Sequence, residues 1–211
     1  HIRTMLRMPR IAKAWQDRYG RAPNADDVEA LYSDFEPALM AVLPQHCDIK
    51  PHVLEAVATL RDKGIKIGST TGFTASMMEV VTREAAKAGY SPDMLVTADD
   101  TGGFGRPWPY MVFENMKRLG LQDVRKIVKV GDTVSDMKEG KNSGLITVGV
   151  TEGSSIIGLD KKSWESLSEM DQFSLRKKAR ETFFANGADF VIDTMAELPK
   201  LIEAIENGEK A

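Results

Sequence analysis

The chain has 211 residues, 42% of them hydrophobic and 28% charged, so it has room for one core and a small additional domain beyond the ~100–150 residues of a typical domain. Its net charge of −3 at pH 7 excludes a broadly basic nucleic-acid-binding surface, and no apolar stretch reaches the ~20 residues of a membrane span, so we expect neither a nucleic acid nor a membrane as partner. The single cysteine, Cys47, excludes an internal disulfide and favours a cytoplasmic location.

The first part of the chain, residues 1–44, is predicted to be helical. Asn24 can cap a helix with Pro37 inside it, which is expected to bend that helix. Apolar residues recur along it at intervals of three and four, at Val28, Leu31, Phe35, Leu39 and Val42. Such a stripe is normally a packing surface. We therefore predict a small helical domain over residues 1–44 and a core domain over residues 45–211.

From Pro51 onward, helices and short apolar strands alternate. The predicted strands cover residues 65–70, 94–97, 126–131, 145–150 and 189–193. The predicted helices end at Lys63, cover residues 74–88, 108–119 and 135–143, lie within 165–186, and close the chain. This alternation predicts an α/β fold of three layers, in which a Rossmann-like parallel sheet has helices on both faces.

Two of the predicted strands lead to side chains that suit a phosphate site. The first runs into Thr70, Thr71 and Gly72, and hydroxyls with backbone N–H groups at a helix N-terminus bind anions well. The second is followed by a glycine-rich loop and Arg106, whose planar guanidinium can bind phosphate oxygens. Each has an ordinary alternative, because Ser and Thr also cap helices and a loop arginine is usually solvated.

The third strand ends in two carboxylates four residues apart. Gly131 lets the backbone turn, Asp132 lies at the carboxyl end of the strand, and Asp136 falls in the first turn of the next helix. Two acids this close repel each other unless a cation lies between them. Mg²⁺ takes one or two protein carboxylates and completes its octahedron with water and phosphate oxygens. We therefore expect Mg²⁺ at Asp132 and Asp136; the alternative is that Asp136 only caps the helix.

A second group of metal-capable side chains lies near the predicted domain junction, and its members are His46, Cys47, Asp48 and His52. Their spacing matches no standard structural zinc site, so we assign no zinc to them.

In this order and at these spacings, the motifs STTG at 69–72, GRPxP at 105–109 and GDTxSDMxEG at 131–140 resemble the second, third and fourth motifs of the haloacid dehalogenase superfamily of aspartyl-phosphate enzymes. Within it the chain resembles the phosphonatase family. Arg106 stands in a GRP setting where most of the superfamily's phosphatases carry lysine, and the opening HIRTMLRMPRIAKAW is also similar. Phe73 departs from the family pattern, which usually has tyrosine there.

The resemblance implies a haloacid dehalogenase-like core with a partial helical cap at residues 1–44. It further implies hydrolysis of phosphonoacetaldehyde to acetaldehyde and phosphate in 2-aminoethylphosphonate degradation, with a Mg²⁺ cofactor and a homodimer formed through the cap. The implied catalytic residues are His1, Thr71, Arg106, Asp132 and Asp136. The implied phosphate-binding residues are Thr70, Thr71, Gly72 and Arg106.

The family's nucleophilic aspartate and its Schiff-base lysine have no counterpart in residues 1–211. We therefore expect the chain to be a fragment that lacks about fifty upstream residues and is inactive by itself. Two alternatives stay open: another phosphatase or phosphomutase of the superfamily, and a truncated product that only binds a partner or phosphate.

Overall fold

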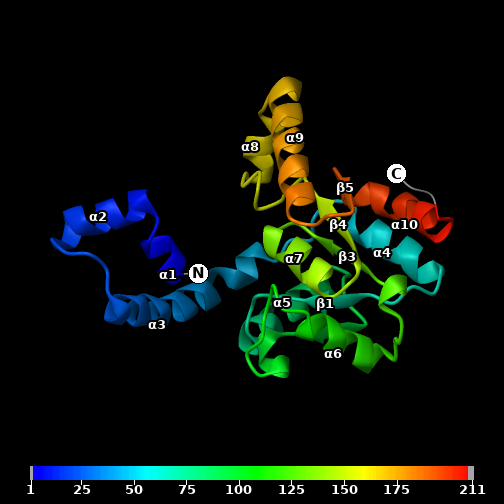
Figure 1. Cartoon of the computed structure of the whole chain (residues 1–211), viewed down its shortest axis with the longest axis horizontal. Helices are drawn as coiled ribbons and strands as arrows, with labels where there is room; N and C mark the ends of the chain where they lie inside the picture. Colours follow the sequence, from blue (N-terminus) through cyan, green and yellow to red (C-terminus); the bar gives the residue numbers. More distant parts are fainter. Residues whose placement is uncertain (1, 209–211) are drawn as a thin grey trace. The chain divides into compact units, whose positions relative to one another are not determined.

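The computed structural model describes residues 2–208, and the chain divides into two compact units, His1–Cys47 and Asp48–Ala211 (Figure 1). His1, a predicted catalytic residue, lies outside the described residues.

The first unit is helical. It comprises α1 (Ile2–Leu6), α2 (Pro9–Tyr19), α3 (Ala25–Val42) and the 3₁₀-helix η1 (Leu43–His46). The predicted cap of α3 is confirmed: the Asn24 side chain accepts a hydrogen bond from the Asp27 N–H at 3.0 Å, and the Asp27 carboxylate accepts one from the Asn24 N–H at 2.8 Å. No residue of α2 or α3 is buried. The predicted stripe of α3 is therefore largely exposed.

The described residues of the second unit contain five strands. Strand β1 (Gly68–Thr70) pairs in parallel with β2 (Met94–Val96), and β3 (Val128–Gly131), β4 (Ile146–Val150) and β5 (Phe190–Ile192) form a second parallel sheet. Every predicted strand is present. Among the described residues they make two sheets instead of one, because β1 and β3 do not pair with each other.

Strand β1 begins at Gly68, three residues later than predicted. The physical reason lies in Asp93, whose carboxylate accepts a hydrogen bond from the Ile67 N–H at 2.7 Å. A side chain thus replaces the backbone partner that a longer strand would need.

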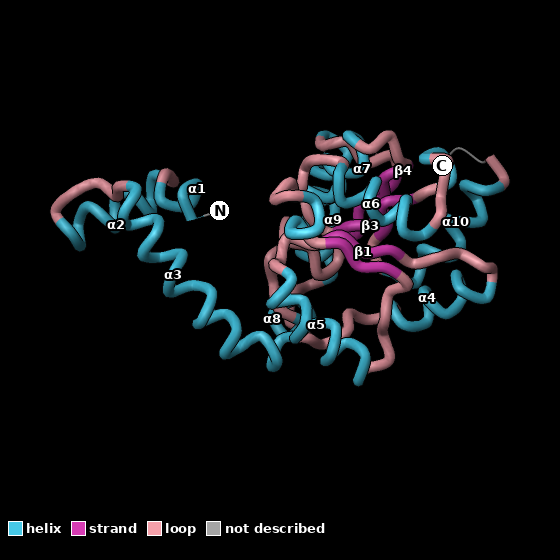
Figure 2. Tube along the Cα trace, turned by 90° about the horizontal axis from the view of Figure 1, so that it is seen from below, coloured by secondary structure: helices cyan, strands magenta, loops and turns pink. Residues whose placement is uncertain are grey.

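Within the described part of the second unit, six longer helices surround these strands (Figure 2): α4 (Val53–Asp62), α5 (Ala75–Lys87), α6 (Tyr110–Leu119), α7 (Val134–Asn142), α9 (Glu169–Ala185) and α10 (Leu198–Glu206). The shorter helices are η2 (Ala98–Thr101), η3 (Val124–Lys126), α8 (Lys161–Glu165) and η4 (Met195–Glu197). Within residues 2–208, every helix is too short or too polar to cross a lipid bilayer.

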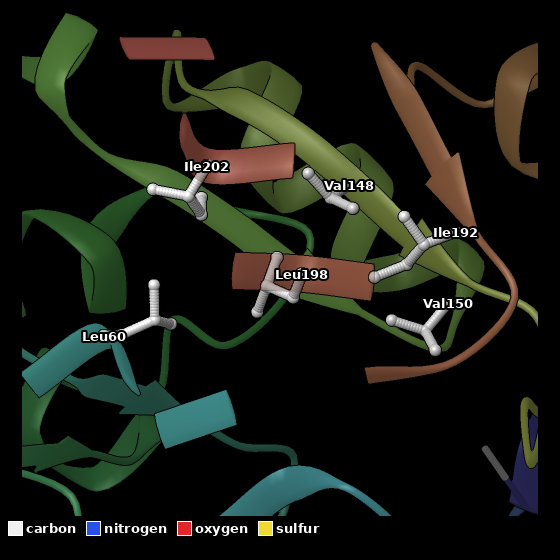
Figure 3. Packing of buried hydrophobic residues seen from close by; sticks show 6 residues of the cluster. All are labelled: Leu60, Val148, Val150, Ile192, Leu198 and Ile202. Atoms are coloured by element: carbon white, nitrogen blue, oxygen red, sulfur yellow. The ribbon is translucent and has the colours of Figure 1, made fainter. Parts of the chain in front are cut away.

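Strand alternation divides the core between the two faces of the β3–β4–β5 sheet. One face packs against α4 and α10 through Leu60, Val148, Val150, Ile192, Leu198 and Ile202, whose side chains converge in Figure 3. The other face packs against α7 and α9 through Met137, Ile157, Ala179, Phe183 and Val191. Successive residues of a strand point to opposite faces. The predicted three-layer α/β fold is thereby confirmed.

Candidate active site

The three polar motifs meet at the carboxyl ends of the parallel strands, where open α/β sheets bind ligands. Thr70 is the last residue of β1, and Gly131 is the last residue of β3. Arg106 reaches the same place from the loop between β2 and α6, because its Nη1 lies 2.6 Å from Oδ1 of Asp136 at the start of α7. The second unit alone thus brings the predicted phosphate and acid motifs together.

The Asp136 carboxylate is surrounded by four donors. Its Oδ1 accepts a hydrogen bond from Arg106 at 2.6 Å and lies 3.1 Å from Nζ of Lys129. Its Oδ2 accepts from the N–H of Thr133 at 3.1 Å and from the Thr133 hydroxyl at 2.6 Å. A carboxylate offers about four lone-pair positions, and these four donors use them. Asp136 therefore caps α7 and anchors Arg106, and its predicted contact with Mg²⁺ stays a prediction.

The charge of Asp136 is balanced within the protein. Burial raises the pKa of Asp136, but the charges of Lys129 and Arg106 and the Thr133 hydrogen bond lower it by more. The net pKa lies below the ordinary value, so the carboxylate is ionised at neutral pH. Lys129 and Arg106 therefore supply positive charge that balances Asp136 within the protein.

Two glycines allow this close packing. A Cβ atom at Gly131 would lie 2.2 Å from Cβ of Asp136, so a side chain there would push α7 away from β3. A Cβ atom at Gly72 would lie 2.9 Å from Nη2 of Arg106. The guanidinium therefore lies against the backbone after β1 while its other amino group holds Asp136. The Arg106 side chain is 21% exposed.

Asp132 is the open carboxylate of the site. Its side chain is 42% exposed, and Oδ2 lies 3.0 Å from Nζ of Lys50. The backbone is fixed, because the Asp132 carbonyl accepts hydrogen bonds from the N–H and the hydroxyl of Ser155, both at 3.2 Å. The Lys50 ammonium also donates to the carbonyl of Gly153. Asp132 can therefore exchange one exposed cation for another without moving its backbone.

The acidic residues of this site meet some of the requirements of a Mg²⁺ site. Among residues 2–208, no cluster of three or more His, Cys, Asp or Glu side chains is placed to hold a metal. Mg²⁺ requires only one or two protein carboxylates, since water and phosphate oxygens supply its other ligands. An exposed acid such as Asp132 beside a phosphate site meets that requirement.

The two threonines at the end of β1, Thr70 and Thr71, differ in their hydrogen bonds. The Thr71 hydroxyl accepts a hydrogen bond from the Phe73 N–H at 3.1 Å, which shapes the turn before α5. The Thr70 hydroxyl donates its one proton to Oε2 of Glu139 at 2.7 Å. The Thr70 hydroxyl proton is therefore used within the protein, and the predicted phosphate-binding role of Thr70 stays a prediction.

The sequence analysis did not predict four residues that lie beside the site: Thr133, Lys129, Glu139 and Lys50. Thr133 and Asp136 form a capping box, a pattern that can be read from the sequence. Lys129 is a charged residue inside an apolar strand, and Glu139 lies one turn after Asp136, so both carried a weak signal. Lys50 carried none.

Comparison with known proteins gives the class to which this arrangement belongs. A family model described as haloacid dehalogenase-like hydrolase matches residues 4–144. That match includes β1, β2, β3 and α7, which together carry all three motifs. The chain belongs to the haloacid dehalogenase-like hydrolases.

Individual relatives show to which family within this class the chain belongs. The chain is 47% identical over 212 residues to the phosphonoacetaldehyde hydrolases of Bacillus thuringiensis (strain Al Hakam) and Bacillus anthracis, an alignment that covers 99% of this chain and 79% of each relative. It is also similar to the crystal structure of a phosphonoacetaldehyde hydrolase-like protein from Oleispira antarctica, with a TM-score of 0.90 and 36% identity, over 100% of this chain and 78% of that one. The chain is a member of the phosphonoacetaldehyde hydrolase family, as its motifs predicted.

Proposed function

We propose that this protein hydrolyses the carbon–phosphorus bond of phosphonoacetaldehyde to acetaldehyde and phosphate, in the degradation of 2-aminoethylphosphonate. The 47% identity over 99% of the chain to phosphonoacetaldehyde hydrolases carries this proposal. The Arg106 guanidinium, held on Asp136 beside Gly72, supports it. Charge stabilisation on the phosphoryl oxygens is the main task of the protein in phosphoryl transfer.

Arg106 is the phosphate-binding side chain of this proposal. Its planar fork can bind two phosphoryl oxygens, and Asp136 fixes its direction. The backbone of Thr71 and Gly72 lies just before α5, whose N-terminus attracts anions. Together these groups hold a phosphonate with its phosphorus facing the strand ends.

Asp132 is the residue that we assign to Mg²⁺. When bound, Mg²⁺ neutralises charge on the phosphoryl oxygens. The exposure of the Asp132 carboxylate supports the assignment. Its Oδ2 is paired with Lys50, but an exposed ion pair of this kind is weak enough for Mg²⁺ to replace it.

The chemical steps also need groups that residues 1–211 do not offer. In the family, an aspartate attacks phosphorus, and a lysine forms an imine that accepts the electrons of the breaking bond. Neither has a counterpart in the sequence. The role of His1 near that imine stays a prediction.

The test compares a polypeptide of residues 1–211 with the complete gene product, both assayed with Mg²⁺ for acetaldehyde and phosphate released from phosphonoacetaldehyde. We expect activity from the complete protein only. Activity of the short polypeptide would contradict the expectation that residues 1–211 are inactive by themselves. A complete protein that hydrolyses phosphate monoesters but not phosphonoacetaldehyde would instead support a phosphatase.

We further propose a cytoplasmic homodimer in which the first unit, as a cap, supplies the interface. The single cysteine is compatible with a reducing compartment. Large apolar side chains are exposed on the first unit, among them Met5, Met8, Tyr19, Tyr32 and Phe35, which is typical of interaction surfaces. Light scattering of the complete protein should give the mass of a dimer; a monomer mass would contradict this.

A further inference from the structure

Lys129 is a charged residue within β3, and only 11% of its side chain is exposed. Three protein oxygens surround its ammonium: Oγ1 of Thr70 at 2.8 Å, Oδ1 of Asp136 at 3.1 Å and Oε2 of Glu139 at 2.6 Å. An ammonium has three protons to donate. Lys129 is therefore satisfied inside the protein and has no proton left for a phosphate ligand.

Glu139 is completely buried on α7. Its Oε2 pairs with Lys129 and accepts the hydroxyl proton of Thr70, whereas its Oε1 has no hydrogen-bond partner among the described residues. Burying a carboxylate is costly unless it is paired. Among the described residues, its paired oxygen is bound by Lys129 and Thr70, so we expect its contribution to the site to pass through them.

The charges of the cluster explain what Lys129 adds. Arg106 and Lys129 both lie on the same oxygen of Asp136. Arg106 and Lys129 hold this carboxylate oxygen from two directions, so Asp136 stays fixed and keeps the Arg106 guanidinium oriented toward the ligand. Glu139 then balances Lys129 and keeps it in place.

We propose that Lys129 and Glu139 are positioning residues of the phosphate site. Glu139 fixes the Lys129 ammonium, and Lys129 fixes both Asp136 and the end of β1 at Thr70, so that Arg106 presents its charge beside Gly72. This inference rests on the proposed function, since it concerns the same phosphate site. Thr70 belongs to this positioning group.

The experiment measures inorganic phosphate binding by calorimetry, together with kcat, KM and thermal unfolding, in the complete protein. Lys129→Met should weaken phosphate binding about tenfold, the loss expected for one oriented charge. Glu139→Gln keeps the shape and should weaken binding by about threefold. Lys138 is an exposed lysine next to Glu139 on α7. Lys138→Met is therefore the matched control and should bind phosphate as the wild type does.

The double variant Lys129→Met with Glu139→Leu separates positioning from stability. Replacing both members of a buried pair by apolar residues often restores stability. We expect its thermal unfolding to recover while phosphate binding stays about tenfold weaker. Recovery of both would show that the pair serves stability only. If the double variant does not fold, wild-type phosphate affinity in Glu139→Gln overturns the proposal by itself.

These outcomes also separate the inference from the proposed function. A wild type that turns over phosphonoacetaldehyde, with phosphate affinity unchanged in the variants, would contradict only the positioning role. A wild type that binds phosphate in a manner dependent on Lys129, yet leaves phosphonoacetaldehyde intact, would contradict only the substrate.

Discussion

The site has an inner half and an outer half that differ in burial. The inner half consists of Asp136, Arg106, Lys129, Glu139 and Thr70, and its four charged side chains are 0 to 21% exposed. The outer half is Asp132 with Lys50, whose side chains are 42% and 54% exposed. Two acids of one short motif thus have opposite tasks. The buried acid is fixed by four donors, and the exposed one can exchange its partner.

The largest effect that this comparison predicts is on turnover. Asp132→Ala in the complete protein should abolish Mg²⁺-dependent hydrolysis of phosphonoacetaldehyde, because the open carboxylate is removed. The unfolding free energy should change by no more than about 1 kcal/mol, since an exposed ion pair contributes little. Glu206→Ala, an exposed acid at the end of α10, is the control. Unchanged activity would remove Asp132 from the site.

Substitutions in the inner half should mainly lower the free energy of unfolding. Asp136→Ala leaves Arg106 and Lys129 facing each other without their shared carboxylate, which should cost about 3–5 kcal/mol of unfolding free energy in urea titrations. If Asp132→Ala and Asp136→Ala destabilise the protein equally, the division into a buried and an exposed half is wrong.

The same residue predicts a pH dependence. The folded-state pKa of Asp136 lies below its ordinary value of 3.8, because Lys129 and Arg106 outweigh the effect of burial. Its stabilisation is therefore complete above the unfolded-state pKa and is lost as the pH falls through the folded-state value. The stability difference between wild type and Asp136→Asn should shrink on acidification below pH ~4. A constant difference would show that the charge of Asp136 does not contribute.

A smaller effect is expected at Arg106, which links the inner half to the ligand. Arg106→Lys keeps the charge but loses the planar fork that binds Asp136 and leaves no room for a side chain at Gly72. Phosphate affinity measured by calorimetry should fall about tenfold. Equal affinity would mean that the guanidinium does not contact the ligand.

The smallest effect concerns Lys50, the counter-ion of the outer half. Lys50→Met frees the Asp132 carboxylate, so Mg²⁺ binding should strengthen by about threefold, within the range of an exposed ion pair. Calorimetry with Mg²⁺ alone measures this without turnover. Weaker Mg²⁺ binding in this variant would show that Lys50 assists the metal site.

The sequence by itself determined the local elements and the order of the motifs. The apolar periodicity predicted all five strands, and the Asn24 cap and the carboxyl-end position of Asp132 follow from patterns only a few residues long. The resemblance to phosphonatases also needed only the three motifs. These features depend on neighbouring residues, which is why one sequence sufficed to find them.

Only the tertiary structure decided the partners of the charged groups. Lys50 meets Asp132 across 82 positions of sequence, and Lys129 meets Thr70 across 59. No short-range pattern reports such contacts, because they form only when parallel strands and their helices pack. The spacing of Asp132 and Asp136 predicted one shared cation. Packing gave Asp136 two internal cations, Arg106 and Lys129, and left Asp132 exposed beside Lys50. Burial, which spacing does not encode, sets the cost of an unpaired charge.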